Sequence, residues 1–193
     1  MEKERKLQII KAADKRFAKH GLNKTTLDEI ARDLRIGKAT IYHYFDSKDE
    51  LFYASLDWEA EQLLEDIRVI FKSENTDLKS RFAEYLNYKE AIGQKYRLVY
   101  ETLLNLLKEN CFEQEVKFAK NLFDNEEELL RSVLASISLE KKDYLNETLS
   151  SFWVGQSWGL LFTNKINLIA GNEKYKSSKE TLLGMLDYFI SRK

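Results

Sequence analysis

Residues 25–51 read TTLDEIARDLRIGKATIYHYFDSKDEL, and this stretch predicts two short helices joined by a tight turn, with a third helix directly behind them. Two helix starts frame it. Thr26 with Glu29, and Ser47 with Glu50, have the spacing of a capping box, in which a hydroxyl and a carboxylate each satisfy a free backbone amide. The spacing therefore predicts helices that begin just after residues 26 and 47.

The first short helix carries Leu27, Ile30 and Leu34 on one face, the i, i+3, i+7 spacing of an amphipathic helix. Arg35 lies in the turn, where either the backbone avoids a positive φ or a non-glycine residue adopts one at some strain. Gly37 is an acceptable N-cap for the next helix.

The second short helix divides into two faces. Ile41, Tyr44 and Phe45 share one side and are expected to pack inward, whereas Lys38, Tyr42 and His43 share the other. An apolar underside below a cation, hydroxyl groups and an imidazole suits a helix laid into a DNA major groove. The residues expected at the DNA are Thr26, Arg35, Lys38, Ala39, Thr40, Tyr42, His43 and Lys48.

This arrangement resembles the DNA-binding domain of the TetR (tetracycline-repressor) family of bacterial regulators. The resemblance runs from the first helix through Gly21 and the Thr25-Thr26 pair to Lys38–Phe45 and Lys48. The chain departs from the family pattern in having Arg35 where glycine is usual and Ala39 where glycine is frequent. The resemblance implies homodimers that repress transcription and release DNA when a small ligand binds the C-terminal domain.

Charge is distributed unevenly along the chain, whose net formal charge is −1. Residues 1–50 carry 12 Lys and Arg against 9 Asp and Glu, while the remaining residues carry 19 against 23. The asymmetry favours the N-terminal part as the nucleic-acid face. No apolar run reaches the length of a membrane span, and the one cysteine, Cys111, excludes an internal disulfide. We therefore expect a cytoplasmic protein that contacts no membrane.

Helical periodicity persists to the C-terminus and the chain has no proline, so we predict an all-α fold of about nine helices. We expect an N-terminal three-helix, helix-turn-helix DNA-binding domain over residues 1–47. A larger helical domain for effector binding and dimerisation is expected over residues 48–193. The first helix is predicted over residues 4–20, with Leu7, Ile10, Ala13 and Phe17 inward and Gly21 at its C-terminal cap.

The last two predicted helices are unusually apolar, and Ser151, Gly155 and Gly159 recur every four residues in the first of them. Interior glycines destabilise a helix by about 1 kcal/mol each, so close approach of another helix is expected to offset them. Either these helices close the core of one chain or they form a dimer interface, as the family resemblance implies. The expected interface residues are Ser151, Gly155, Gly159, Phe162, Leu182, Leu186 and Phe189.

Aromatic residues of the C-terminal part either line a cavity for a small hydrophobic effector or belong to the ordinary core. The candidate ligand-binding residues are Tyr85, Tyr96, Tyr100, Leu103, Phe118, Leu122, Phe123, Phe152 and Trp158.

Two other classes of protein, an enzyme and an interaction module, fit the sequence less well than a regulator. With two histidines, one cysteine and no glycine-rich phosphate loop, the chain offers no metal, nucleophile or nucleotide motif, so we expect no enzyme, no metal and no cofactor. A helical interaction module that no longer binds DNA is disfavoured by Lys38, Tyr42, His43 and Lys48.

Overall fold

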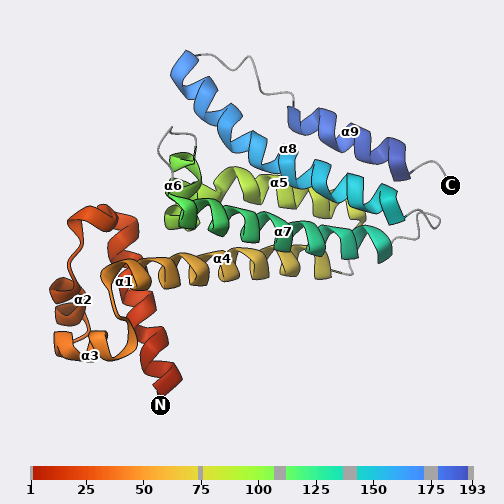
Figure 1. The fold of residues 1–193 in the computed structure, drawn as a ribbon. Coiled ribbons are helices and arrows are strands. Elements are labelled where there is room, and N and C mark those ends of the chain that lie inside the picture. Colours follow the sequence, from red (N-terminus) through yellow and green to blue (C-terminus); the bar gives the residue numbers. More distant parts are fainter. Residues whose placement is uncertain (1, 74–75, 107–111, 137–142, 172–177, 191–193) are drawn as a thin grey trace. The chain divides into compact units, whose positions relative to one another are not determined.

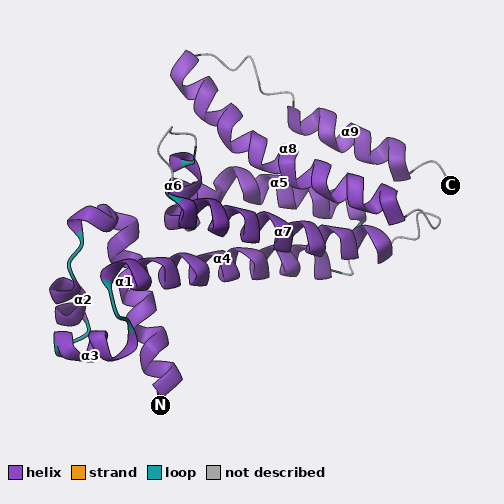
Figure 2. Ribbon diagram, in the orientation of Figure 1, coloured by secondary structure: helices purple, strands orange, loops and turns teal. Residues whose placement is uncertain are grey.

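The computed structural model describes residues 2–73, 76–106, 112–136, 143–171 and 178–190 (Figure 1). Within these ranges the side chains of residues 143–146, 162–170, 178 and 189–190 are not described. The described residues form nine helices and no strand, with short loops and turns between some of the helices (Figure 2). The predicted all-α fold is confirmed. None of the helices searched in the described part is long and apolar enough to cross a membrane.

The chain divides into two compact units. The first comprises Met1–Leu63 and Tyr96–Glu115, and the second comprises Leu64–Lys95 and Val116–Lys193. The division falls inside the 25-residue helix α4, Lys48–Lys72, which therefore contributes to both units. The functional boundary at residues 47–48 stays a prediction.

The first unit contains α1 (Glu2–Lys24), α2 (Leu27–Asp33), α3 (Lys38–Tyr44), the start of α4, and α6 (Arg97–Asn105). Helix α1 packs against α2 and α6, and α2 packs against α3. The buried stripe of α1 is Ile9, Ala13 and Phe17, at a spacing of four residues. The prediction that Leu7 points inward was wrong, because Leu7 lies outside this stripe and is 38% exposed, while Ile10 is half-buried.

Helix α1 is interrupted at Gly21, whose φ of 78° and ψ of 166° are not helical. A positive φ is accessible to glycine without the steric cost that other residues carry. The chain leaves helical geometry one residue after the predicted end at residue 20, although helical hydrogen bonding resumes and carries α1 to Lys24.

The second unit contains the remainder of α4 with α5 (Leu78–Lys95), α7 (Glu113–Ser136), α8 (Asp143–Ala170) and α9 (Ser178–Ile190). Helix α5 packs against both α8 and α9, and its Phe82, Tyr85 and Leu86 are completely buried. Trp153 of α8 packs on Phe82 with ring centroids 4.6 Å apart. An aromatic core therefore centres on α5 and α8.

Candidate nucleic-acid interface

The predicted capping box at the start of α2 is present. The Thr26 hydroxyl oxygen accepts a hydrogen bond from the Glu29 N–H at 3.3 Å, and the Thr26 N–H donates to Glu29 Oε2 at 2.9 Å. At the start of α4, Ser47 Oγ accepts from the Glu50 N–H as predicted. The carboxylate of Glu50, however, accepts from the Asp46 N–H at 2.6 Å, one residue before the predicted donor.

The turn between α2 and α3 is closed by two hydrogen bonds. The Arg35 N–H donates to the Arg32 carbonyl at 3.1 Å, and the Ile36 N–H donates to the Ala31 carbonyl at 3.0 Å. This pair of bonds is the Schellman motif, which places its C′ residue in the left-handed region. That residue is Arg35, with a φ of 53°, the one positive-φ non-glycine residue in the described part of the chain. The turn is therefore made at some backbone strain rather than by avoiding a positive φ.

Helix α3 begins after Gly37, whose extended backbone makes it the N-cap, as predicted. Ile41 and Phe45 are fully buried below the helix, and Tyr44 is half-buried. On the opposite face Tyr42 is 49% exposed. Lys38, Ala39 and His43 are also exposed, and Thr40 is half-buried. The two predicted faces of α3 are therefore present, and its outward face carries the residue types that contact base edges and phosphates.

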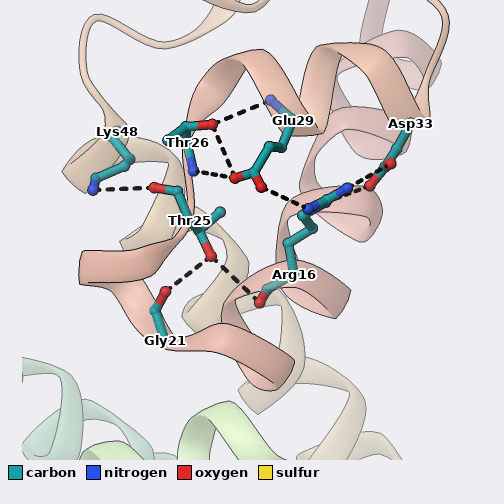
Figure 3. A network of polar contacts seen from close by, with 7 residues as sticks. All are labelled: Arg16, Gly21, Thr25, Thr26, Glu29, Asp33 and Lys48. Atoms are coloured by element: carbon teal, nitrogen blue, oxygen red, sulfur yellow. Dashed lines mark hydrogen bonds and ion pairs between the residues drawn. The ribbon is translucent and has the colours of Figure 1, made fainter.

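A polar network fixes α2 on α1 (Figure 3). Arg16 of α1 makes a bidentate ion pair with Asp33 at the end of α2, with N···O distances of 2.6 and 2.8 Å, and a second contact with Glu29 at 3.3 Å. The Arg16 guanidinium lowers the pKa of the Asp33 carboxyl, chiefly through this hydrogen bond. The buried Thr25 hydroxyl donates to the Gly21 carbonyl at 2.9 Å.

Lys48 has a role that the sequence did not reveal. Its ammonium donates to the Thr25 carbonyl at 3.2 Å (Figure 3) and to the Leu22 carbonyl at 2.8 Å, and so ties the start of α4 to the end of α1 and the connection that follows it. Thr26, likewise expected at the DNA, is occupied by its capping interactions with Glu29. Their contacts with phosphate stay predictions.

The N-terminal turns of α1 also lie beside α3, which the sequence did not predict. A groove with a volume of about 650 Å³ lies between these turns and α3, lined by Glu2, Glu4, Arg5, Gln8, Thr40, His43 and Tyr44. The excess of Lys and Arg in residues 1–50 was the only available signal, since nothing in the sequence indicates that Arg5 lies beside α3.

The candidate ligand-binding residues are divided between the two units. Tyr96, Tyr100 and Leu103 belong to the first unit, whereas Tyr85, Phe118, Leu122, Phe123, Phe152 and Trp158 belong to the second. In the second unit, Tyr85 and Trp158 meet at a buried carboxylate, that of Glu126. Tyr85 Oη donates to Glu126 Oε1 at 2.6 Å, and Trp158 Nε1 donates to Glu126 Oε2 at 2.7 Å. Phe123 packs on Trp158 with ring centroids 5.5 Å apart.

A buried lysine completes this cluster. Lys89 of α5 donates to both Glu126 oxygens, at 2.8 and 2.9 Å, and its ammonium lies 3.2 Å from the centroid of the Trp158 ring. Both charged side chains are completely buried. Burial lowers the pKa of Lys89 to about 8 despite the opposing effect of the Glu126 charge. The sequence reasoning did not single out either residue, because Lys and Glu on amphipathic helices usually face solvent.

The expected dimer residues differ in their surroundings. Ser151 and Gly155 are exposed and Gly159 is half-buried, but Leu182 and Leu186 are buried within the chain. Among the described residues, a Cβ added at Gly155 or Gly159 meets no atom within 4 Å outside the backbone of α8 itself. The side chains of Phe162 and Phe189 lie outside the described residues, as does Cys111.

Comparisons with known proteins agree with this geometry. Residues 9–54 match the family model described as bacterial regulatory proteins, tetR family. Over 194 aligned residues the chain is 24% identical to the biofilm operon icaADBC negative transcriptional regulator IcaR of Staphylococcus aureus, covering 96% of this chain and 98% of IcaR. Over 101 residues it is 29% identical to the transcriptional activator FasR of Mycolicibacterium smegmatis, covering 51% of this chain and 46% of FasR.

Solved structures show the same fold. A transcriptional regulator from Cytophaga hutchinsonii superposes with a TM-score of 0.65 at 24% identity, covering 94% of this chain and 92% of the other. GusR of Salmonella enterica superposes with a TM-score of 0.67 at 18% identity, covering 96% and 94%. The capped helix-turn-helix, the outward polar face of α3 and these similarities lead to one conclusion: the chain is a DNA-binding transcriptional regulator, and its residues 9–54 are similar to the DNA-binding domain of the tetR family of bacterial regulatory proteins.

Proposed function

We propose that the protein is a cytoplasmic homodimeric repressor rather than an enzyme, and that a small hydrophobic effector releases it from a near-palindromic operator. The observation that carries the DNA-binding part is the outward face of α3, where Lys38, Tyr42 and His43 stand exposed over a buried Ile41. Repression is favoured over activation by the similarity to IcaR, which extends over nearly the whole chain, whereas that to FasR covers half of it.

The second unit supports the homodimer. The glycine side of α8 has room for a neighbouring helix, since a Cβ at Gly155 or Gly159 meets nothing within 4 Å in the described part of the chain outside the backbone of α8. Helix α9 presents Met185 and Tyr188, which are 45% and 54% exposed. A partner's helices would give both surfaces an apolar neighbour. A two-fold dimer would present two copies of α3, and docking in successive major grooves of the operator requires them to be about 34–36 Å apart.

The effector is assigned to the second unit, where Tyr85, Trp158 and the buried Lys89–Glu126 pair lie among aromatic side chains. An effector drives release only through different affinities for the DNA-bound and DNA-free conformers. Native mass spectrometry of the purified protein tests assembly and effector together. A dimer with a discrete additional mass supports both, a bare dimer removes support for a retained effector, and a monomer contradicts the homodimer.

Fluorescence anisotropy with a duplex selected from a randomised pool tests DNA recognition. We expect a steep decrease of log affinity with log salt, and weaker binding of selected and scrambled duplexes when Tyr42 is replaced by Ala. Tyr188→Ala, which makes the same change in the second unit, is the control. At protein concentrations above the dimer dissociation constant, it should leave the affinity of the dimer for a scrambled duplex unchanged. Equal binding by wild type and Tyr42→Ala would place the DNA surface elsewhere.

A further inference from the structure

Helix α3 begins with a lysine whose charge is already paired. Lys38 Nζ lies 2.7 Å from Oδ2 of Asp28, which belongs to the first turn of α2. The side chains of Lys38 and Asp28 are 44% and 57% exposed, so the pair stands on the surface formed by both helices of the helix-turn-helix. The hydrogen bond with Asp28 is the main reason why the pKa of Lys38 is raised.

Stability alone gives little reason for this pair. An exposed ion pair contributes little to folding because water and salt screen it. A carboxylate next to DNA is moreover repelled by phosphates, so Asp28 opposes the non-specific attraction that an unpaired lysine would supply. The arrangement has a better rationale in base recognition.

The donors of Lys38 and the acceptor of Asp28 are complementary to the hydrogen-bonding groups of one base pair. An ammonium has three donors, and the bond to Asp28 leaves two for other acceptors. In the major groove, guanine offers two adjacent acceptors, O6 and N7, and the cytosine paired with it offers the N4 amino group as a donor. Lys38 can donate to the guanine while Asp28 accepts from the cytosine.

Other base pairs fit less well. In an A·T pair of the same orientation, thymine O4 faces the carboxylate where cytosine has its amino group, so two acceptors oppose each other. In a T·A pair only one acceptor, thymine O4, is available to the lysine. Reversing G·C to C·G brings an acceptor to the carboxylate and a donor to the ammonium.

We propose that Asp28 and Lys38 together read a single G·C base pair in each half of the operator, with Asp28 as a specificity-determining residue. This inference rests on the proposed docking of α3 in the major groove. Asp28 disfavours sites that lack the cytosine amino group, and it keeps Lys38 from serving as a phosphate contact of any sequence.

Selection of duplexes from a randomised pool tests the inference with wild type, Asp28→Asn and Lys38→Gln. Wild type is expected to enrich a G·C pair at one position of each half-site. Asp28→Asn should still select the remaining positions, but its preference for G·C at that position should decrease about fivefold or more. Its affinity for a scrambled duplex should increase, since a negative charge near the phosphates is removed. Lys38→Gln should lose the preference for guanine at the same position.

Asp49→Asn is the matched control, because it makes the same change of charge in the first turn of α4. If Asp28→Asn raises the affinity for operator and scrambled duplex by the same factor, as the control does, Asp28 reads no base and the inference is overturned. Thermal melting of each variant verifies that α2 remains folded. Failure of the proposed function itself has a different signature: Tyr42→Ala would then bind both duplexes as tightly as wild type, or wild type would select no sequence.

Discussion

At the scale of single residues, Arg35 is the departure from the family pattern with the clearest physical cost. It occupies the left-handed position of a Schellman motif, with a φ of 53°. For a residue with a Cβ this conformation costs roughly 1–2 kcal/mol, whereas glycine adopts it freely. Arg35 is exposed and close to the start of α3, so a contact with DNA phosphate is a reason for keeping a cation there.

Arg35→Gly should therefore change stability and DNA binding in opposite directions. We expect the free energy of unfolding in urea to increase by up to about 1 kcal/mol, because the relief of strain exceeds the extra entropy of glycine in the unfolded chain. DNA affinity should decrease for all sequences and its salt dependence should become shallower. Arg35→Asn is the control, because asparagine also tolerates a positive φ and the change removes the charge. Arg32→Gly is unsuitable as a control because Arg32 lies within α2. A less stable Arg35→Gly variant would show that the side chain of Arg35 outweighs the backbone strain.

At the scale of elements, the sequence predicted the helices and caps whose signals are local. The capping box at Thr26, the N-cap at Gly37 and the two faces of α3 each depend on residues within about eight positions of one another. Bonds between distant elements were not predicted. Lys89 and Glu126 are 37 residues apart, and their individual types indicate solvent exposure. The same limitation applies to Lys48, whose acceptors are 23 and 26 residues away.

The start of α6 depends on a carboxylate from another helix. Glu59 of α4, only 4% exposed, accepts hydrogen bonds from the N–H groups of Leu98, at 3.3 Å, and Val99, at 2.6 Å. The side chain of Tyr96, the N-cap of α6, does not cap the helix, and Glu59 accepts from the helix amides instead. Burial, and to a smaller extent the charge of Asp14 on α1, raises the pKa of Glu59 to about 7 against the opposing effect of these two hydrogen bonds. Burial also raises the pKa of Asp14 to about 6.

The contribution of Glu59 to stability should decrease as pH rises. The unfolded chain loses this proton near pH 4.5 and the folded chain near pH 7, so the folded state holds more protons between these values. The contribution is fully present below about pH 4.5 and is lost as pH rises through about 7, with a total of roughly 3 kcal/mol. Glu59→Gln keeps an acceptor for α6 and removes the charge. In urea unfolding from pH 5 to 8, we expect it to be more stable than wild type at pH 8 and to depend less on pH.

Glu61→Gln is the control for this measurement, since Glu61 is an exposed carboxylate on the same helix. It should retain the wild-type dependence on pH. If Glu59→Gln retains it as well, Glu59 is not the titrating group.

The buried ion pair of the second unit makes a different prediction. Lys89→Met leaves the Glu126 carboxylate buried without its cation, and we expect a loss of roughly 3–5 kcal/mol in the free energy of unfolding. Lys89→Met combined with Glu126→Gln removes both charges and should recover most of this loss. Urea unfolding of the two variants at pH 7 measures the difference. Equal destabilisation by the single and double variants would mean that packing around Lys89 matters more than its charge.

At the scale of the whole molecule, the proposed homodimer can be tested with a substitution on α8. The open glycine side of α8 predicts that a bulky residue is tolerated by the chain itself but not by a dimer. Gly155→Leu should therefore keep its helical circular dichroism, while light scattering should show a shift from dimer to monomer. The affinity of this variant for an operator with two half-sites should be at least tenfold weaker than that of wild type. Asn121→Leu, an exposed position on α7, is the control and should remain dimeric. A fully dimeric Gly155→Leu would place the interface on another surface.

The hydrogen bonds between Glu59 and the start of α6 also bear on the construction of chimaeric regulators. The polar network around Arg16 and Lys48 closes within residues 16–48, which suggests that the N-terminal helices can be transplanted onto a foreign sensor by splicing after residue 48. Such a splice leaves behind both Glu59 and the amides that it holds, together with the helix that packs on α1. A transplant that carries the chain as far as Leu63, together with Tyr96–Glu115, keeps the whole first unit and should be the more portable part.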